Sequence, residues 1–263
     1  MSAPTSAKPE RRRSWRSLLI PAVLALAVLV GLGTWQIQRK AWKEQLIATL
    51  TERLRAPSVP LPAPATWPTL DQASNEYRRV TFEAEFETAK EALVFATASA
   101  FRPDVKGQGF WIFAPARLPD GSVVVVNRGF APAAEAMTLP DRANPGIVAI
   151  TGAIRWPEAS HWFTPKPNPA ENMWFVRDPV SIAAAKGWGA IAPFYVEQES
   201  PVPPGGWPQP GKLVPSLTDN HLQYAVTWFG LALVLAVVFI VWAVKSGRET
   251  RRKRPGNAPS SSL

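Results

Sequence analysis

The chain has 263 residues, of which 46% are hydrophobic, 28 are proline and none is cysteine. Without cysteine it can form no disulfide, no thiolate metal site and no cysteine nucleophile, which excludes a copper–thiolate metallochaperone. Once the two apolar runs described below are set aside, enough chain remains for one ordinary soluble domain.

The net charge of +9 is confined to the two ends of the chain. Residues 1–17 and 245–263 together carry eleven basic and two acidic side chains, so residues 18–244 are neutral overall. Basic residues that directly flank apolar spans mark the cytoplasmic side of a membrane. The charge therefore indicates two cytoplasmic tails, 1–17 and 245–263, and it disfavours nucleic-acid binding.

Two apolar runs are long enough to cross a bilayer. The first, residues 18–37, exceeds the usual apolar region of a signal peptide and lacks a clear cleavage site, so we expect an uncleaved transmembrane helix. Trp15 and Trp35 bracket it about 30 Å apart, as interfacial aromatic residues do. The second, residues 220–244, carries no charge after its polar entry and predicts a second transmembrane helix.

The segments that follow each membrane boundary differ in composition from the core. Helical spacing of Trp42, Leu46 and Leu50 predicts that the first helix continues outside the membrane. Five prolines between residues 57 and 68 then favour an extended tether, so residues 38–70 are expected to form a helix extension and a tether. Residues 201–219, rich in Pro and Gly, predict a second tether. The two tethers frame a soluble domain, residues 71–200, on the periplasmic side.

Signals within residues 71–200 are mostly those of β-strands. Residues 79–87 alternate apolar and polar side chains, as a half-buried strand does. Further strands are expected at 93–98, 109–116, 122–128, 147–155, 173–176 and 194–197. Pro119-Asp120-Gly121 predicts a hairpin turn. One helix is expected from Pro179, with Asp178 as N-cap, to near Gly187. These features predict a membrane-anchored α+β protein whose soluble domain is a β-rich antiparallel sheet or partly closed barrel with one or two helices.

Motifs for enzymatic chemistry are missing from the sequence. The chain has two histidines and no GxSxG, GxGxxG or P-loop pattern, which leaves no support for a serine hydrolase or a nucleotide-binding enzyme. Two histidines are also too few for a metal site built from several imidazoles. His161 lies in a loop rich in Trp and Pro, where we expect a surface or packing role. The protein is therefore predicted not to be an enzyme.

His221 begins the second apolar run and is the best functional candidate. One interpretation is a histidine at the mouth of a helix, hydrogen-bonded to backbone or to a lipid headgroup. The other is an axial ligand for haem, because one neutral imidazole suffices for five-coordinate iron. On a helix His221, Tyr224 and Trp228 share a face, and Trp228 could stack on a porphyrin. Asn220 and Gln223 could orient the imidazole or meet the propionates.

Two motifs resemble the surfeit-locus family of cytochrome c oxidase assembly factors. They are Gly33-Thr34-Trp35-Gln36, followed by Arg39-Lys40 and Trp42-Lys43, and Asn220-His221-Leu222-Gln223-Tyr224-Ala225, followed by Thr227-Trp228-Phe229. Between them, Asp120-Gly121, the valines 123–126 and Asn127-Arg128-Gly129-Phe130 resemble the central strand–turn–strand of the family. The similarity covers residues 18–244. Phe130 and Phe229 depart from the Trp and Tyr found in many relatives, and the missing hydroxyl at 229 weakens any role there in contacting propionates.

The resemblance implies a membrane-anchored factor that transiently binds haem a and presents it to the largest subunit of an aa3-type oxidase. We expect the chain to lie in a bacterial inner membrane, with both termini cytoplasmic and the soluble domain periplasmic. Haem a synthase would be the second partner, and His221 matches the histidine that the family uses for haem. Arg128 could meet a propionate, although pairing with a neighbouring carboxylate is favoured. The alternative function is an assembly scaffold that stabilises an oxidase subunit without touching haem.

Overall fold

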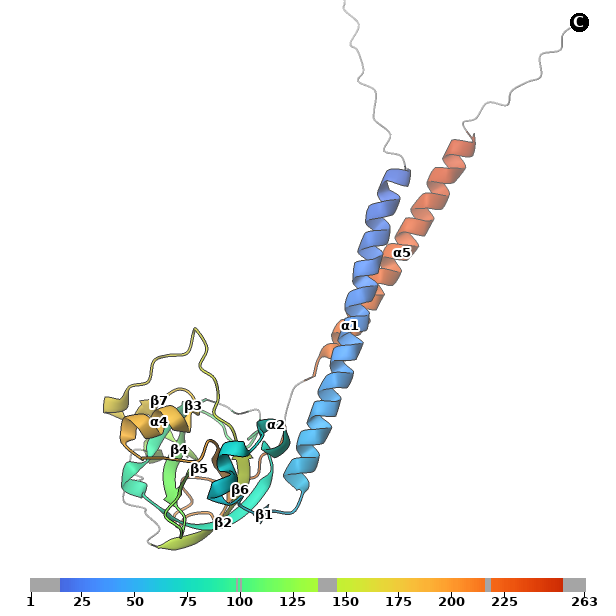
Figure 1. Cartoon of the computed structure of the whole chain (residues 1–263). Coiled ribbons are helices and arrows are strands. Elements are labelled where there is room, and N and C mark those ends of the chain that lie inside the picture. The colour runs from blue at the N-terminus through green and yellow to red at the C-terminus, as the bar shows by residue number, and fades with distance from the viewer. Residues whose placement is uncertain (1–14, 98, 100, 137–145, 216–218, 253–263) are drawn as a thin grey trace, which may run out of the picture. The chain divides into compact units, whose positions relative to one another are not determined.

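The computed structural model describes residues 15–97, 99, 101–136, 146–215 and 219–252. The chain divides into two compact units, one from residues 1–45 and 218–263 and the other from residues 46–217. The first unit contains most of one long helix and the whole of another, and the second contains the end of the first helix and a β-rich domain (Figure 1). Most of the two basic tails, residues 1–14 and 253–263, lies outside the described residues.

The two long helices are α1, Trp15–Arg55, and α5, His221–Arg252. Both contain a stretch long and apolar enough to cross a membrane, Leu19–Arg55 in α1 and His221–Arg248 in α5. Large apolar side chains on both are exposed, among them Ile20 at 68% and Leu233 at 65%. A soluble core helix would bury such side chains, whereas lipid covers them at no cost. The expectation of two apolar helices that flank a β-rich domain is confirmed.

The expected helical continuation beyond the first apolar run is present, because α1 runs without a break to Arg55. The proline-rich segment after it is not a free tether. Strand β1, Val59–Pro60, pairs with the sheet, and Trp67 is 7% exposed within the core. Here the expectation is corrected, because proline lacks an N–H but its carbonyl and its neighbours still pair: the Leu61 amide donates to the Thr81 carbonyl at 3.1 Å.

The second proline-rich segment also belongs to the folded domain. Leu213 is 4% exposed, and the Gly211 amide donates to the Gln198 carbonyl at 3.0 Å. Phe130 and Gln209 exchange two backbone hydrogen bonds, of 3.1 and 2.7 Å. The domain therefore extends well beyond residues 71–200, and polyproline composition alone did not reveal this packing.

Five strands close into a barrel in the order β2–β6–β8–β5–β4, with β4 pairing back to β2 (Figure 1). Strands β3 and β7 extend the sheet beyond β4, and β1 lies beside β2. The strands are β2 Arg79–Phe86, β3 Ala92–Ala96, β4 Gly109–Arg117, β5 Val123–Pro132, β6 Ile147–Arg155, β7 Met173–Trp174 and β8 Tyr195–Ser200. The short helices are α2 Gln72–Asn75, α3 Ala133–Ala136 and α4 Pro179–Lys186, with 3-10 turns at Pro64–Thr69, Thr88–Lys90 and Pro169–Glu171.

The β-rich prediction is therefore confirmed, with two refinements. The barrel is closed, because Glu85 and Phe86 at the end of β2 pair with Arg117 and Ala116 of β4. The sheet is not purely antiparallel, because β5 and β8 run parallel. Local expectations hold at the hairpin, where Gly121 has φ +87°, and at α4, where Asp178 accepts the amides of Val180 and Ser181. Residue 98, at the end of one expected strand, lies outside the described residues.

The barrel places alternate side chains inside, as period-two geometry requires. Ala114, Val124, Val126 and Ile150 are fully buried in one core cluster. Val125 and Tyr195 point to the opposite side and are also fully buried, because they belong to a second cluster that contains Ile182 of α4. This two-sided burial explains the unbroken valine run in β5. Each buried valine or isoleucine side chain contributes about 1.5–3 kcal/mol when it leaves water.

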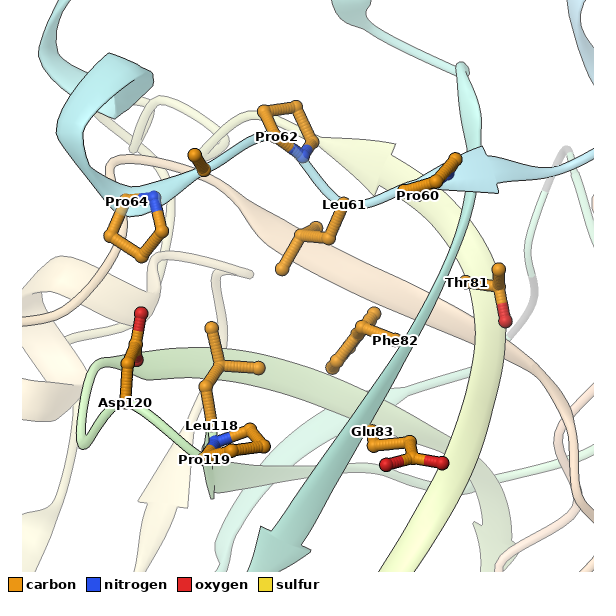
Figure 2. A pocket seen from close by; sticks show the side chains of 11 residues that line it. Pro60, Leu61, Pro62, Pro64, Thr81, Phe82, Glu83, Leu118, Pro119 and Asp120 are labelled. Carbon is orange, nitrogen blue, oxygen red and sulfur yellow. The ribbon is translucent and has the colours of Figure 1, made fainter.

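An apolar groove of about 410 Å³ lies where β1 and the β4–β5 turn meet the edge of β2 (Figure 2). Leu61, Phe82 and Leu118 point into it, and Glu83 and Asp120 lie at its rim. In the described registers β1 pairs with Val80 and Thr81, and β4 with Glu85 and Phe86. The groove follows the short length of β2 that neither of these strands covers.

The Asn127-Arg128-Gly129-Phe130 motif attaches the second proline-rich segment to the barrel. Gly129 has φ +126°, and a Cβ there would lie 2.2 Å from the Gln209 carbonyl oxygen. Asn127 Oδ1 accepts the Gly129 amide at 3.1 Å, which helps to hold this conformation. Only glycine satisfies both the dihedral angle and the close approach.

We therefore expect Gly129→Ala to lower the free energy of unfolding by roughly 3 kcal/mol or more, from backbone strain and displacement of the Gln209 segment. Thermal unfolding of the purified chain, followed by near-ultraviolet circular dichroism, measures the change. Gly189→Ala is the matched control: Gly189 has φ +78° but no atom within 4 Å of a Cβ. It should cost about 1 kcal/mol. Equal losses in the two variants would contradict the role of the close contact.

Candidate functional site

Helices α1 and α5 pack against each other along faces with a spacing of three and four residues (Figure 1). The less exposed positions lie on one stripe of each helix, as they do in a pair of helices packed side by side. On α1 they include Ala22, Leu26, Leu29, Gly33, Gln36 and Lys40, and on α5 His221, Ala225, Trp228, Ala232, Leu235 and Phe239. We call this contact the α1–α5 interface.

Small residues allow the two helices to approach closely. Ala225 is 1% and Ala232 5% exposed at the α1–α5 interface. A Cβ added to Gly33 would lie 2.7 Å from the ring of Phe229, so the glycine makes room for that ring. Small residues serve the same purpose in membrane helix pairs generally, because lipid supplies no hydrophobic force that holds helices together. In the Gly33-Thr34-Trp35-Gln36 motif (GTWQ), the glycine thus has a structural role, which is to make room for the Phe229 ring.

Gln36, the last residue of the Gly33-Thr34-Trp35-Gln36 motif, contacts the candidate histidine directly. Gln36 Oε1 lies 2.7 Å from Nδ1 of His221, and both side chains are half-buried at the interface. The backbone amide of His221 donates to Asp219 Oδ1 at 2.9 Å, which caps the start of α5. The other GTWQ side chains point elsewhere: Thr34 Oγ1 donates to the Val30 carbonyl within α1, and Trp35 is 51% exposed.

This contact decides which imidazole nitrogen can act. An amide oxygen accepts hydrogen bonds but cannot donate them, so Nδ1 is the donor of this contact, and in the neutral imidazole Nε2 then keeps its lone pair. No hydrogen-bond partner of Nε2 is present in the described part of the chain. An imidazole fixed at Nδ1 by an acceptor is the form in which histidine ligates a metal through Nε2. The arrangement therefore fits an axial ligand to haem iron.

A site for a bare metal ion has less support. Within the described residues no group of three or more His, Cys, Asp or Glu side chains is placed to hold one. Haem iron already has four porphyrin nitrogens and requires only one or two protein ligands. The single imidazole at His221 is therefore enough for haem iron but not for a bare metal ion.

The remaining predicted residues at the helix mouth lie around His221 at different exposures. Trp228 is half-buried on the same face, two turns along α5. Tyr224 is 54% exposed and flanks this face, because Ala225 takes the interface position next to His221. Asn220 and Gln223 are exposed as well. The structure thus brings His221 together with Gln36 and places Trp228 two turns further along the same stripe of α5. Tyr224, Asn220 and Gln223 lie on the outer surface of the helix.

Arg128 lies in the β-rich domain and is paired with a carboxylate. Its guanidinium contacts Glu91 in a short ion pair, with both side chains less than 10% exposed, and stacks 4.7 Å from the ring of Phe86. Burial raises the pKa of Glu91, and Arg128 opposes that rise. The favoured expectation for Arg128, pairing with a neighbouring carboxylate, is what the structure shows.

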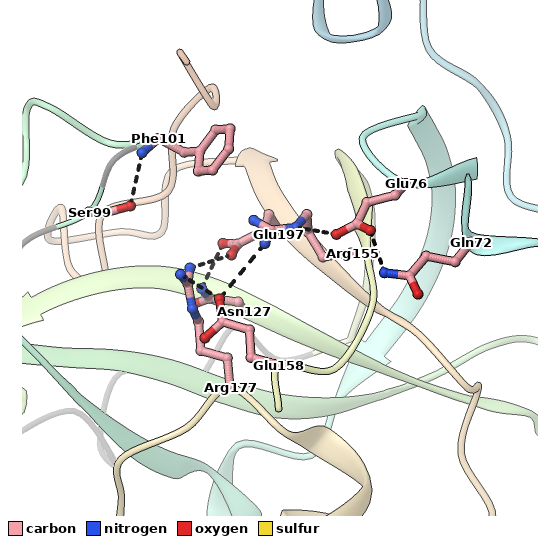
Figure 3. Close-up of polar contacts among 9 residues, drawn as sticks. All are labelled: Gln72, Glu76, Ser99, Phe101, Asn127, Arg155, Glu158, Arg177 and Glu197. Atoms are coloured by element: carbon pink, nitrogen blue, oxygen red, sulfur yellow. Dashed lines mark hydrogen bonds and ion pairs between the residues drawn. The ribbon is translucent and has the colours of Figure 1, made fainter. Parts of the chain in front are cut away.

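A second polar cluster, largely buried, links side chains of several strands (Figure 3). Arg177 contacts Glu158 at 2.8 Å and Glu197 at 3.1 Å, and Asn127 Nδ2 donates to Glu197 Oε2 at 2.6 Å. Burial disfavours the charge of Arg177, but the carboxylates of Glu197 and Glu158 outweigh it and raise the pKa of Arg177. Burial also raises the pKa of Tyr195, so its phenol stays neutral. These groups act mainly on one another, which indicates a structural role.

His161 is exposed and stacks on Phe163, with ring centroids 5.6 Å apart. This is the packing role that its loop predicted. Gln36 is the residue that reasoning from His221 alone missed. The sequence did offer a signal for it, because Gln36 is an amide near the end of the first apolar run and belongs to the Gly33-Thr34-Trp35-Gln36 motif. Its pairing with His221, however, joins residues 185 positions apart.

Comparisons with known proteins identify the family of this chain. A family model described as the SURF1 family matches residues 23–233. A SURF1-like protein from Monosiga brevicollis is 32% identical over 92% of this chain and 91% of its own length. Surfeit locus protein 1 of Homo sapiens is 32% identical over 94% of this chain and 81% of its own, and that of Rattus norvegicus is 30% identical over 95% and 80%. The chain belongs to the SURF1 family.

Proposed function

We propose that this protein is a membrane-anchored assembly factor for an aa3-type cytochrome c oxidase, and that it binds haem a and presents it to the haem–copper subunit. The observation that carries the proposal is the 2.7 Å contact between Gln36 Oε1 and His221 Nδ1 at the α1–α5 interface. Family membership supports the role in oxidase assembly, and the freed Nε2 supports the binding of haem. Haem a synthase and the largest oxidase subunit are the partners that such a role requires.

The residues at the site divide the work of holding a haem that must later leave. His221 Nε2 would ligate the iron, and Gln36 would keep the imidazole in the required tautomer and orientation. Trp228 would pack on the porphyrin, while Asn220, Gln223 and Tyr224, which are exposed at the helix mouth, would meet its polar edge. When bound, haem a supplies the redox-active iron that the oxidase needs. One protein ligand binds haem less firmly than two, which suits a carrier that gives up its cargo.

The location proposed for this activity is a membrane whose outer face bears the β-rich domain. The two apolar helices support anchoring. Basic residues before the first apolar run and after the second favour both termini on the cytoplasmic side of a bacterial inner membrane. His221, at the start of α5, would then lie at the outer boundary between water and lipid.

We expect His221→Ala to reduce the haem retained on purification to background, because the iron loses its ligand. Gln36→Leu should reduce it by about tenfold, since removal of a group that orients a ligand typically costs that much or more. Gln38→Leu is the matched control, because Gln38 is exposed on the same helix. The measurement is Soret absorbance per mole of protein made in cells that synthesise haem a. Equal haem in His221→Ala and the parent would instead favour an assembly scaffold that does not touch haem.

Variants of Arg128 can distinguish a structural role of this residue from a contact with a haem propionate. Arg128→Met leaves the carboxylate of Glu91 buried without its partner and should cost about 3–5 kcal/mol of stability. Adding Glu91→Leu removes the buried charge and should restore most of that loss. We expect the double variant to retain as much haem as the parent, measured by the same absorbance. A stable double variant with little haem would place Arg128 at the haem.

The absence of cysteine makes the orientation easy to test by labelling. Lys166 in the β-rich domain and Arg248 in α5 are both exposed and can each be changed to the single cysteine of the chain. In intact spheroplasts a membrane-impermeant maleimide should label Lys166→Cys and spare Arg248→Cys until the membrane is disrupted, because basic flanks stay cytoplasmic. Labelling in the reverse pattern would contradict the proposed orientation.

A further inference from the structure

An apolar cleft lies between the two membrane helices, away from the His221–Gln36 contact. It has a volume of about 140 Å³ and is lined only by apolar side chains. Ala22 and Leu26 contribute from α1, and Leu235, Ala236 and Phe239 from α5. The cleft exists because Ala22 and Ala236 are too short to fill the space that the larger neighbours hold open.

Its position along the helices can be compared with that of the histidine. At 1.5 Å per residue, Leu26 lies about 15 Å and Ala22 about 21 Å from Gln36 along α1. On α5, Leu235 lies about 21 Å from His221 by the same rise. The cleft therefore belongs to the same interface as the proposed haem ligand and begins about 15–20 Å deeper in the membrane.

Haem a differs from haem b in chemistry that matches this distance. It carries a long isoprenoid chain on the porphyrin edge, with about a dozen backbone carbons. With carbon–carbon bonds of about 1.5 Å, such a chain extends roughly 15 Å, and the porphyrin radius adds several ångströms. A chain that starts from a haem held at His221 therefore reaches the cleft with its last carbons.

The size of the cleft agrees with that partial occupancy. An apolar cavity of about 150 Å³ is known to accommodate one benzene molecule, so a cleft of this size takes about one isoprene unit. Lipid is as apolar as the lining, so the cleft selects by shape and packing rather than by removing the chain from water. A branched chain with methyl groups suits a surface on which small and large side chains alternate.

We propose that this cleft holds the end of the isoprenoid chain of haem a and makes the protein prefer haems that carry this chain over haem b. The inference rests on the proposed haem binding. It assigns to α1 and α5 two separate tasks along one interface: the outer end holds the iron, and the deeper part recognises the chain.

The test compares haem o with haem b, because haem o has the isoprenoid chain and lacks the formyl group that also distinguishes haem a. The full chain in phosphatidylcholine nanodiscs is titrated with each haem, and the dissociation constant is read from the Soret band. Ala236→Leu fills the cleft from α5, and Ala22→Leu fills it from α1. Ala27→Leu is the control, because Ala27 is exposed on α1.

The parent and Ala27→Leu should bind haem o more tightly than haem b, by about threefold to tenfold for a few carbons that pack well. Ala236→Leu and Ala22→Leu should bring this ratio close to one and leave the affinity for haem b unchanged. An unchanged ratio in both filling variants overturns the inference and indicates that a lipid chain occupies the cleft. Equal affinity of the parent for the two haems overturns it as well, while His221 keeps its role. If the parent binds neither haem o nor haem b, the proposed haem-binding function itself is wrong.

Discussion

The hydrogen bond between Gln36 Oε1 and His221 Nδ1 is the interaction on which the proposed site depends. Both groups lie on the facing stripes of α1 and α5, where an unpaired polar atom is costly. The bond satisfies Oε1 of Gln36 and Nδ1 of His221 and links α1 to α5. Between membrane helices such bonds contribute only about 0.6–2 kcal/mol, so the same contact is more important for orientation than for stability.

This orientation has a chemical consequence because imidazole has two nitrogens with opposite roles. An acceptor at Nδ1 leaves a lone pair at Nε2, whereas a donor there would do the reverse. The contact also keeps the ring from turning freely at the end of a helix, where side chains usually have several rotamers. A glutamine oxygen that accepts at this place thus leaves the other nitrogen with its lone pair, at the level where α5 begins.

The β-rich domain shows a different solution to buried polarity. Arg128 and Glu91 neutralise each other inside the domain, and Arg177, Glu158, Glu197 and Asn127 form a connected group on the barrel. The motif Asn127-Arg128-Gly129-Phe130 combines three of these needs in consecutive residues. Asn127 orients the Gly129 amide, Arg128 balances a carboxylate, and Gly129 admits the backbone of Gln209. This motif therefore attaches the Gln209 segment to the barrel and balances a buried carboxylate.

The sequence by itself determined the two apolar helices, most strands, the Pro119–Gly121 turn and the capped helix after Asp178. These features depend on local patterns: length for a span, period two for a strand, and cap or turn chemistry for the ends. It also singled out His221 and its motif. Only the tertiary structure decided the closure of the barrel, the parallel pairing of β5 with β8, the packing of both proline-rich segments and the pairing of His221 with Gln36. Each of these joins residues far apart in the chain, so no local period or propensity encodes which partner is met. The side of a helix that faces its neighbour depends on the neighbour, and that is why Tyr224 and Trp228, grouped by spacing, lie at different exposures.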